Sequence, residues 1–186
     1  MDVLEAIHAR RSHKSLAEPA PDDAQVRTML EAAVAAPDHK LLRPWRFTIL
    51  RGLDKDAFRE VMVEGLRRRE PGATPGQVDK TRTALDRAPL VIIVACRRVD
   101  DRLPFEELLA ATAAAVQNLL LAATALGFGA IWRTGAPCGD PYVKAALGLD
   151  VDDVISAFVY LGTPTSEPEM TERTLDGVVT PWTASG

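Results

Sequence analysis

From Leu108 to Phe128 the chain carries no charged side chain. A stretch of about 20 residues is long enough to cross a bilayer as a helix. This one, however, is rich in alanine, has Gln117 and Asn118 at its centre, and lacks the aromatic and basic flanks that membrane-spanning helices usually have. A helix that is apolar most of the way round is otherwise buried. The segment therefore predicts a buried helix in a protein that does not enter the membrane.

The cover for this helix has to come from other parts of the protein. The short helix expected over residues 2–9 is too small to cover it alone. The alanines permit close approach of another helix, so a second subunit can supply part of the cover. We therefore favour a homodimer over a monomer with a central helix, since two-fold dimers are the commonest oligomers.

Length and composition limit the class of protein. The 186 residues fit one domain, 1–186, with a core of its own. A net charge of −4 argues against nucleic-acid binding, because such domains are usually basic. Cys96 and Cys138 stand outside any Cys-x-x-Cys or Cys/His cluster, so neither a metal site nor a disulfide framework is expected. Residues 1–9 lack the apolar core of a secretory signal, and we expect a cytoplasmic protein.

Helical and extended patterns alternate along the chain without regular β-α-β units. They predict an α+β fold in which helices flank a small, mostly antiparallel or mixed sheet. The tail over 163–186 has prolines and little apolar periodicity, so we expect it to wrap a partner subunit. The expected strands are 45–50, 90–95, 129–132 and 154–161, and the expected helices are 2–9, 21–35, 54–69, one that ends at 87, 106–126 and 141–147.

Two short basic motifs carry most of the functional information. Arg10-Arg11-Ser12 and Ile131-Trp132-Arg133-Thr134-Gly135 each place a guanidinium beside a hydroxyl and backbone donors, which are the groups that bind phosphate. Between them stands Ala36-Pro37-Asp38-His39-Lys40, followed by Arg43-Pro44-Trp45. Taken alone, the first two arginines also suit a solvated helix end, where cations are favoured. Together the motifs indicate a bound phosphorylated cofactor.

In this order the motifs resemble those of the FMN-dependent nitroreductase family, and most closely its compact YdjA-like members. The run Tyr160-Leu161-Gly162-Thr163-Pro164 fits the same family, and the resemblance covers essentially the whole chain. It implies an intertwined homodimer with two FMN sites at the subunit interface. It also implies an enzyme that reduces nitro compounds or quinones with NADH or NADPH.

The resemblance gives the motif residues roles in binding FMN. Arg10 and Ser12 are expected at the phosphate or ribityl chain, with Arg133 as a second phosphate contact. Lys14 is either an ammonium near N1 and O2 of the flavin, where it stabilises the reduced ring, or an ordinary exposed lysine. His39 either reaches the FMN of the other subunit or caps its own loop. The full expected set is Arg10, Arg11, Ser12, Lys14, His39, Ile131, Trp132 and Arg133.

Two positions depart from the pattern of the family. Relatives often carry Arg where this chain has Ala35, and Gln where it has Arg43. The first departure removes a guanidinium that could contact FMN.

The predicted reaction is a ping-pong transfer at the flavin. NAD(P)H passes a hydride to N5 and leaves, and an electron-poor acceptor then takes the hydride from N5. No side chain is required as a catalytic base. The glycines at 127 and 129 follow a helix, whereas a Rossmann fingerprint follows a strand, and the third glycine of the fingerprint is absent. The absence of this dinucleotide-binding motif agrees with an NAD(P)H that visits the flavin only transiently.

Two other functions are compatible with parts of the sequence. The same residues would serve a flavin-binding sensor or carrier with little turnover. A helical interaction protein without a cofactor would use the apolar helix over 108–128, but it leaves both arginine motifs unexplained.

Overall fold

Strand β3 (Leu90–Cys96) lies at the centre of the molecule, and all seven of its residues are buried. Residues 90, 92 and 94 pack into one apolar cluster with α2 (Asp23–Val34) and α5 (Phe105–Ala125). Residues 91, 93 and 95 pack into a second cluster with α3 (Gly52–Arg69). Because both faces of the strand are covered, its sequence is a continuous apolar run without polar alternation.

This computed structural model describes residues 1–100, 102–168 and 173–183. Two parts of the predicted tail, 169–172 and 184–186, lie outside the described residues. The described tail residues beyond 173 contain neither helix nor strand, which agrees with the absence of apolar periodicity there.

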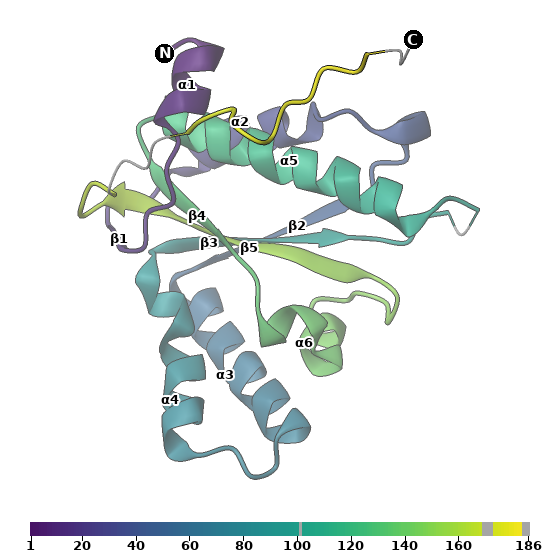
Figure 1. The fold of residues 1–186 in the computed structure, drawn as a ribbon. Coiled ribbons are helices and arrows are strands. Elements are labelled where there is room, and N and C mark those ends of the chain that lie inside the picture. Colours follow the sequence, from purple (N-terminus) through teal and green to yellow (C-terminus); the bar gives the residue numbers. More distant parts are fainter. Residues whose placement is uncertain (101, 169–172, 184–186) are drawn as a thin grey trace.

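The described residues form an antiparallel sheet of five strands (Figure 1). β2 (Trp45–Arg51) pairs with one edge of β3, and β5 (Val154–Pro164) pairs with the other. β4 (Gly129–Arg133) and the two-residue β1 (Leu16–Ala17) both pair with β5. The antiparallel form of the predicted sheet is confirmed, as are its four predicted strands. β1 is too short to produce a period of two in the sequence.

Helices cover both faces of the sheet, as the predicted fold requires (Figure 1). α1 (Val3–Ala9), α2 and α5 lie on one face, and α3, α4 (Pro75–Arg82) and α6 (Pro141–Ala146) lie on the other. The predicted helix that ends at residue 87 is an α-helix only as far as Arg82. It continues as the 3-10 helix η2 (Thr83–Arg87).

Helix α5 is the buried helix that the uncharged segment predicts. It is long and apolar enough to cross a membrane, yet 44% of its most apolar window is buried inside the protein. Its central Asn118 donates a hydrogen bond from Nδ2 to the carbonyl oxygen of Ala32 in α2, at 3.1 Å. The polar residue that argued against a membrane span therefore holds two helices of the core together.

We expect Gly162→Ala to destabilise the fold, because β5 has no room there for a methyl group. A Cβ at Gly162 would lie 2.7 Å from Cδ of Pro89 and 2.9 Å from the carbonyl oxygen of Ala17. Overpacking of this kind costs about 1–3 kcal/mol in the free energy of unfolding, which urea denaturation measures. Gly76→Ala in α4 is the control, since a Cβ there meets nothing within 4 Å. Equal effects of the two substitutions would contradict the packing argument.

Candidate functional site

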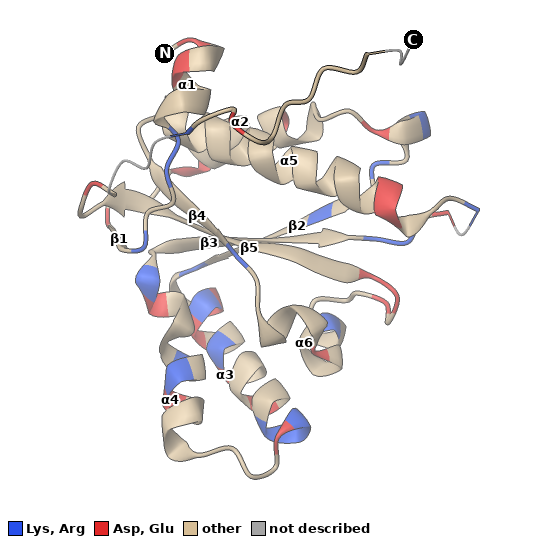
Figure 2. Cartoon of the chain, in the orientation of Figure 1, with Lys and Arg blue, Asp and Glu red and all other residues tan. Residues whose placement is uncertain are grey.

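The first arginine motif lies beside the second in the folded chain. After α1 ends at Ala9, the chain runs along the outer edge of β4. Ser12 forms a parallel bridge with Ala130, and the backbone N–H of His13 donates to the carbonyl oxygen of Ala130 at 3.0 Å. Residues 118 positions apart in the sequence are therefore neighbours, and Figure 2 shows basic residues both on this linker and at the end of β4.

A third arginine, from the tail, joins the first motif. The Arg173 guanidinium donates to the carbonyl oxygens of Arg10 at 3.2 Å and of Ile7 at 3.5 Å. Partial burial lowers the pKa of Arg10 below its ordinary value, and repulsion from Arg173 and Arg11 lowers it further. Neither Arg10 nor Arg173 forms an ion pair with another residue that the structure describes. This basic cluster, made of Arg10, Arg11 and Arg173, suits an anion.

Sequence reasoning missed Arg173. It stands in Glu-Arg-Thr, far from both basic motifs, and nothing in its neighbourhood marks it as a ligand. Only the course of the tail over α1 brings it to Arg10.

The second motif ends in a basic group at the other end of β4. The Arg133 guanidinium lies 5.9 Å from the centre of the Tyr160 ring. Its Nε is buried and has no hydrogen-bond partner among the described residues. Gly135 follows with a φ of 148° and a ψ of −168°, a conformation that is essentially restricted to glycine. The glycine of this motif is therefore required by the backbone.

The two basic groups do not meet at one point. Ser12 contacts β4 at Ala130, and Arg133 is three residues further along the strand. At about 3.3 Å for each residue of a strand, the main-chain separation is about 10 Å. The structure thus places the two basic groups at opposite ends of β4.

The remaining residues of the two motifs have different environments. Trp132 donates from Nε1 to the carbonyl oxygen of Ser156 at 2.9 Å and keeps its side chain partly exposed. Ile131 packs against the cluster on the α3 face of the sheet. Lys14 is exposed on the linker beyond Ser12.

His39 lies beside the start of α5. Its Nδ1 is 3.8 Å from Oε2 of Glu107, at the start of α5, whereas β4 follows the end of that helix. A helix of 21 residues is about 30 Å long. His39 therefore lies at the opposite end of α5 from Gly129, where β4 begins, and whether it serves the other subunit or caps its own loop stays a prediction.

The loop around His39 has an unusual backbone. Lys40, Leu41 and Arg43 have φ values of 55°, 56° and 49°, a region that non-glycine residues rarely occupy and that costs about 1–3 kcal/mol each. The backbone N–H of Arg43 donates to the carboxylate of Asp38, which helps to hold the loop in this shape. The Ala-Pro-Asp-His-Lys motif thus folds into a strained turn and not into a flexible connection.

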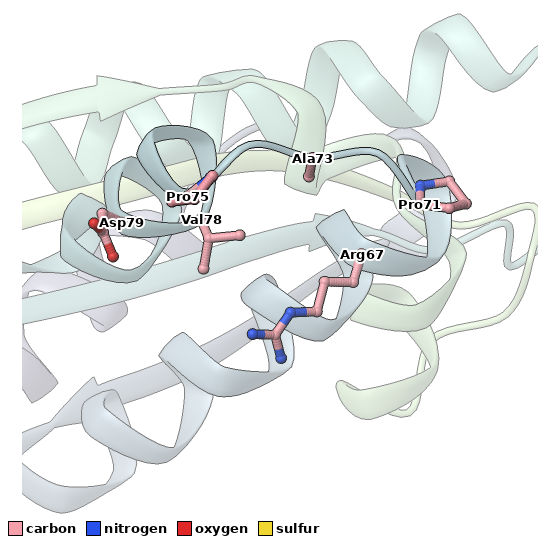
Figure 3. Close-up of a pocket in the computed structure, with 6 residues that line it drawn as sticks. All are labelled: Arg67, Pro71, Ala73, Pro75, Val78 and Asp79. Atoms are coloured by element: carbon pink, nitrogen blue, oxygen red, sulfur yellow. The ribbon is translucent and has the colours of Figure 1, made fainter.

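A cavity of about 440 Å³, which we call the lower cavity, opens beside the end of β4. It lies between α3, α4 and the sheet, and Arg133, Thr134 and Gly135 form one wall. A second cavity, of about 560 Å³, lies at the turn between α3 and α4 (Figure 3) and contains none of the predicted residues. We therefore place the site at β4 and the lower cavity. No group of three metal-binding side chains occurs within the described part of the chain.

Asp140 supports the loop that follows Gly135. Its buried carboxylate accepts from the backbone N–H of Tyr142 at 2.9 Å and so caps α6. The same carboxylate pairs with Arg69 of α3. A Cβ on Gly65 would lie only 2.7 Å from Oδ2 of Asp140, so glycine at 65 leaves room for the pair. The segment between β4 and α6 is thereby fixed to α3.

Comparison with known proteins decides the family. The sequence profile of the nitroreductase family matches residues 7–163. The chain belongs to the nitroreductase family. YdjA of Escherichia coli (strain K12), provisionally named as an NAD(P)H nitroreductase, is 40% identical over 165 residues, which cover 88% of this chain and 89% of YdjA. YfhC of Bacillus subtilis (strain 168), with the same provisional name, is 30% identical over 174 residues, or 92% of this chain and 89% of YfhC.

Solved structures agree with this assignment. A nitroreductase-like family protein from Bacillus cereus has the same fold, with a TM-score of 0.84 at 23% identity over 97% of this chain and 96% of that one. A provisionally named nitroreductase from Desulfovibrio desulfuricans, solved in complex with FMN, has a TM-score of 0.75 at 28% identity over 98% of both chains. The predicted family, the nitroreductase-like α+β fold and the oxidoreductase class are confirmed.

We expect Asp140→Ala to lower the free energy of unfolding by about 2 kcal/mol. Loss of a helix cap costs about 1 kcal/mol, and loss of a partly buried partner for Arg69 adds to it. Chemical denaturation measures the change. Asp79→Ala is a matched control, because Asp79 is exposed and 3.6 Å from Arg82, and exposed pairs contribute less than about 1 kcal/mol. A loss no greater than that of the control would show that Asp140 does not hold the loop.

Proposed function

We propose that this protein is an FMN-dependent oxidoreductase that uses NADH or NADPH to reduce nitro compounds or quinones. The observation that carries the proposal is the pair of basic groups at the two ends of β4, since FMN has its phosphate and its ring at opposite ends of a ribityl chain. The name of YdjA and the FMN in the Desulfovibrio relative support it.

The basic cluster and Ser12 hold the phosphate in this proposal. Arg10 and Arg173 lie together without a carboxylate partner among the described residues, and the pKa of Arg10 is lowered by burial and by its two cationic neighbours. A doubly negative phosphate removes that repulsion and accepts from the forked guanidinium donors. The Ser12 hydroxyl, exposed next to β4, adds a neutral donor.

The other end of β4 holds the ring. The buried Nε of Arg133 lacks a partner among the described residues, and a polar edge of the flavin would satisfy it. Ile131 and Trp132 precede Arg133 on β4, with Ile131 packed against the cluster on the α3 face, and Thr134 follows as an exposed residue. This differs from the phosphate contact expected for Arg133, because β4 holds Arg133 away from Arg10. Lys14 stays a proposed contact to the pyrimidine edge.

Bound FMN would supply the redox chemistry, by accepting a hydride from NAD(P)H and passing it to the acceptor after NAD(P)+ has left. The side chains of this protein bind, orient and screen the reactants. In this proposal none of the predicted site residues has to move a proton.

We also propose that the chain acts as a homodimer in the cytoplasm, as one domain whose tail wraps the partner. α1 exposes Val3 and Leu4, and the tail exposes Leu175, Val178 and Trp182, more apolar surface than a free segment would keep. In this dimer His39, which lies beside the start of α5, touches the FMN of the other subunit.

FMN binding and turnover test the proposal directly. We expect the full chain, mixed with FMN and desalted, to keep flavin absorption bands and to oxidise NADPH or NADH in the presence of menadione or a nitroaromatic compound. Arg10→Ala and Arg173→Ala each remove a charged donor worth about 1.5–3 kcal/mol, so we expect about 10- to 100-fold weaker FMN binding, measured by fluorescence titration.

Arg27→Ala is the matched control for these variants. Arg27 lies exposed on α2 in a pair with Glu31 and belongs to no part of the site. A colourless wild-type protein would overturn the proposal, and retained flavin without turnover would favour a sensor or carrier instead.

The dimer is tested by Leu4→Glu, which places a charge on the exposed apolar face of α1. If that face is buried against a partner, an unpaired charge there strongly disfavours association, and we expect the variant to sediment as a monomer. Leu53→Glu is the control, because Leu53 is 84% exposed on α3, on the opposite face of the sheet. A wild-type protein that sediments as a monomer would contradict the proposed dimer.

A further inference from the structure

The lower cavity carries an excess of positive charge. Arg69, Lys80, Arg87 and Arg133 line it, and among the described residues Glu70 is the one acidic residue in its wall. None of these except Arg133 belongs to a motif that the sequence marks. Whether each of these cations is available to a ligand depends on its pairing within the protein.

Arg69 and Glu70 neutralise groups inside the protein. Arg69 pairs with the buried carboxylate of Asp140 and lies 3.5 Å from Glu70. Gln77 also donates from Nε2 to Glu70 at 3.1 Å. These two residues therefore form part of the cavity wall, and their charges are already paired within the protein.

Lys80 and Arg87 remain as cations without an acidic partner among the described residues. Lys80 is on α4 and Arg87 ends η2, and both are exposed residues that line the same cavity as Arg133. Burial raises the pKa of the Tyr160 phenol, while the positive charges of Arg133 and Arg87 oppose that rise. The Arg133 guanidinium lies 5.9 Å from the centre of the Tyr160 ring, and Arg87 and Tyr160 both line the cavity.

The rest of the lining is apolar. Met62, Leu66, Ala84, Pro137 and Phe158 contribute to it. A volume of about 440 Å³ is within the range of small-molecule sites, which combine apolar walls with a few placed polar groups. Such a cavity fits an aromatic ring that carries a negative charge at one end.

We propose that the lower cavity, through Lys80 and Arg87, selects an electron acceptor that carries an anionic group such as a carboxylate on an apolar ring. This rests on the proposed function, because the cavity adjoins the Arg133 end of β4 where the flavin ring is placed. A 2′-phosphate of NADPH is a less suitable occupant, since it lies on the adenosine half of the dinucleotide, away from the ring that reacts.

The test compares 4-nitrobenzoate with neutral 4-nitrobenzamide as acceptors for the FMN-loaded enzyme. In the double variant Lys80→Gln, Arg87→Gln, we expect kcat/KM for the benzoate to fall at least 10-fold, which corresponds to the loss of a charged hydrogen bond. The value for the benzamide should change less than threefold. Replacing Lys80→Gln by Lys80→Arg in the double variant should restore part of the lost kcat/KM for the benzoate. Lys144→Gln, on α6, is the control.

Three results would overturn the proposal. The first is an equal fall in kcat/KM with both acceptors, and the second is a loss of flavin retention in the double variant. The third is a fall in activity with NADPH but not with NADH, which would assign the cations to the phosphate of the donor. Calorimetric binding of 4-nitrobenzoate to the full chain gives a readout that does not need turnover. If no acceptor is reduced but the benzoate binds 10-fold more weakly to the double variant, the cavity is supported and the proposed activity is not.

Discussion

The pairing of β3 with β5, covered by helices on both faces, is the constraint on which the rest of the structure depends. All seven residues of β3 are buried, and β5 pairs with β3 along one edge and with β4 along the other, while Thr163 and Pro164 near its end pair with β1. β4 therefore becomes an edge strand. Its free edge accepts the linker after α1, and the position of both arginine motifs follows from this one arrangement.

An edge strand is well suited to gather groups from distant parts of a chain, because its outer backbone groups remain free to pair. Here the edge of β4 is met by residues 10–13, while the tail reaches the same place through Arg173. From below, α3 fixes the loop after Gly135 through Arg69 and Asp140. The rigid part of the candidate site is thus β4 together with the loop that α3 holds. The charged side chains of residues 10–13 and of Arg173 come to it from segments outside the sheet.

The sequence predicts the parts of this protein whose signal is local. The strand over 90–96 and the helix over 105–125, predicted as 90–95 and 106–126, follow from long apolar runs. Both arginine motifs are recognisable by residue type. Neither β1 nor the end of α4 at Arg82 could be predicted, since each depends on pairing or packing with distant residues. For the same reason Arg173, Lys80 and Arg87 were missed. Each is an ordinary surface cation until the topology places it beside a site.

The charge distribution explains how a protein with a net charge of −4 can favour anionic ligands. At physiological salt, a charge acts over about 8 Å, so a bound reactant responds to the nearest groups and hardly to the net charge. Along β4 those groups are Arg10 with Arg173 at one end and Arg133 at the other, and Lys80 and Arg87 continue the series across the lower cavity. In the proposed arrangement the phosphate, the flavin edge and the anionic acceptor each meet a different cation, so the three would be held at once without competing for one site.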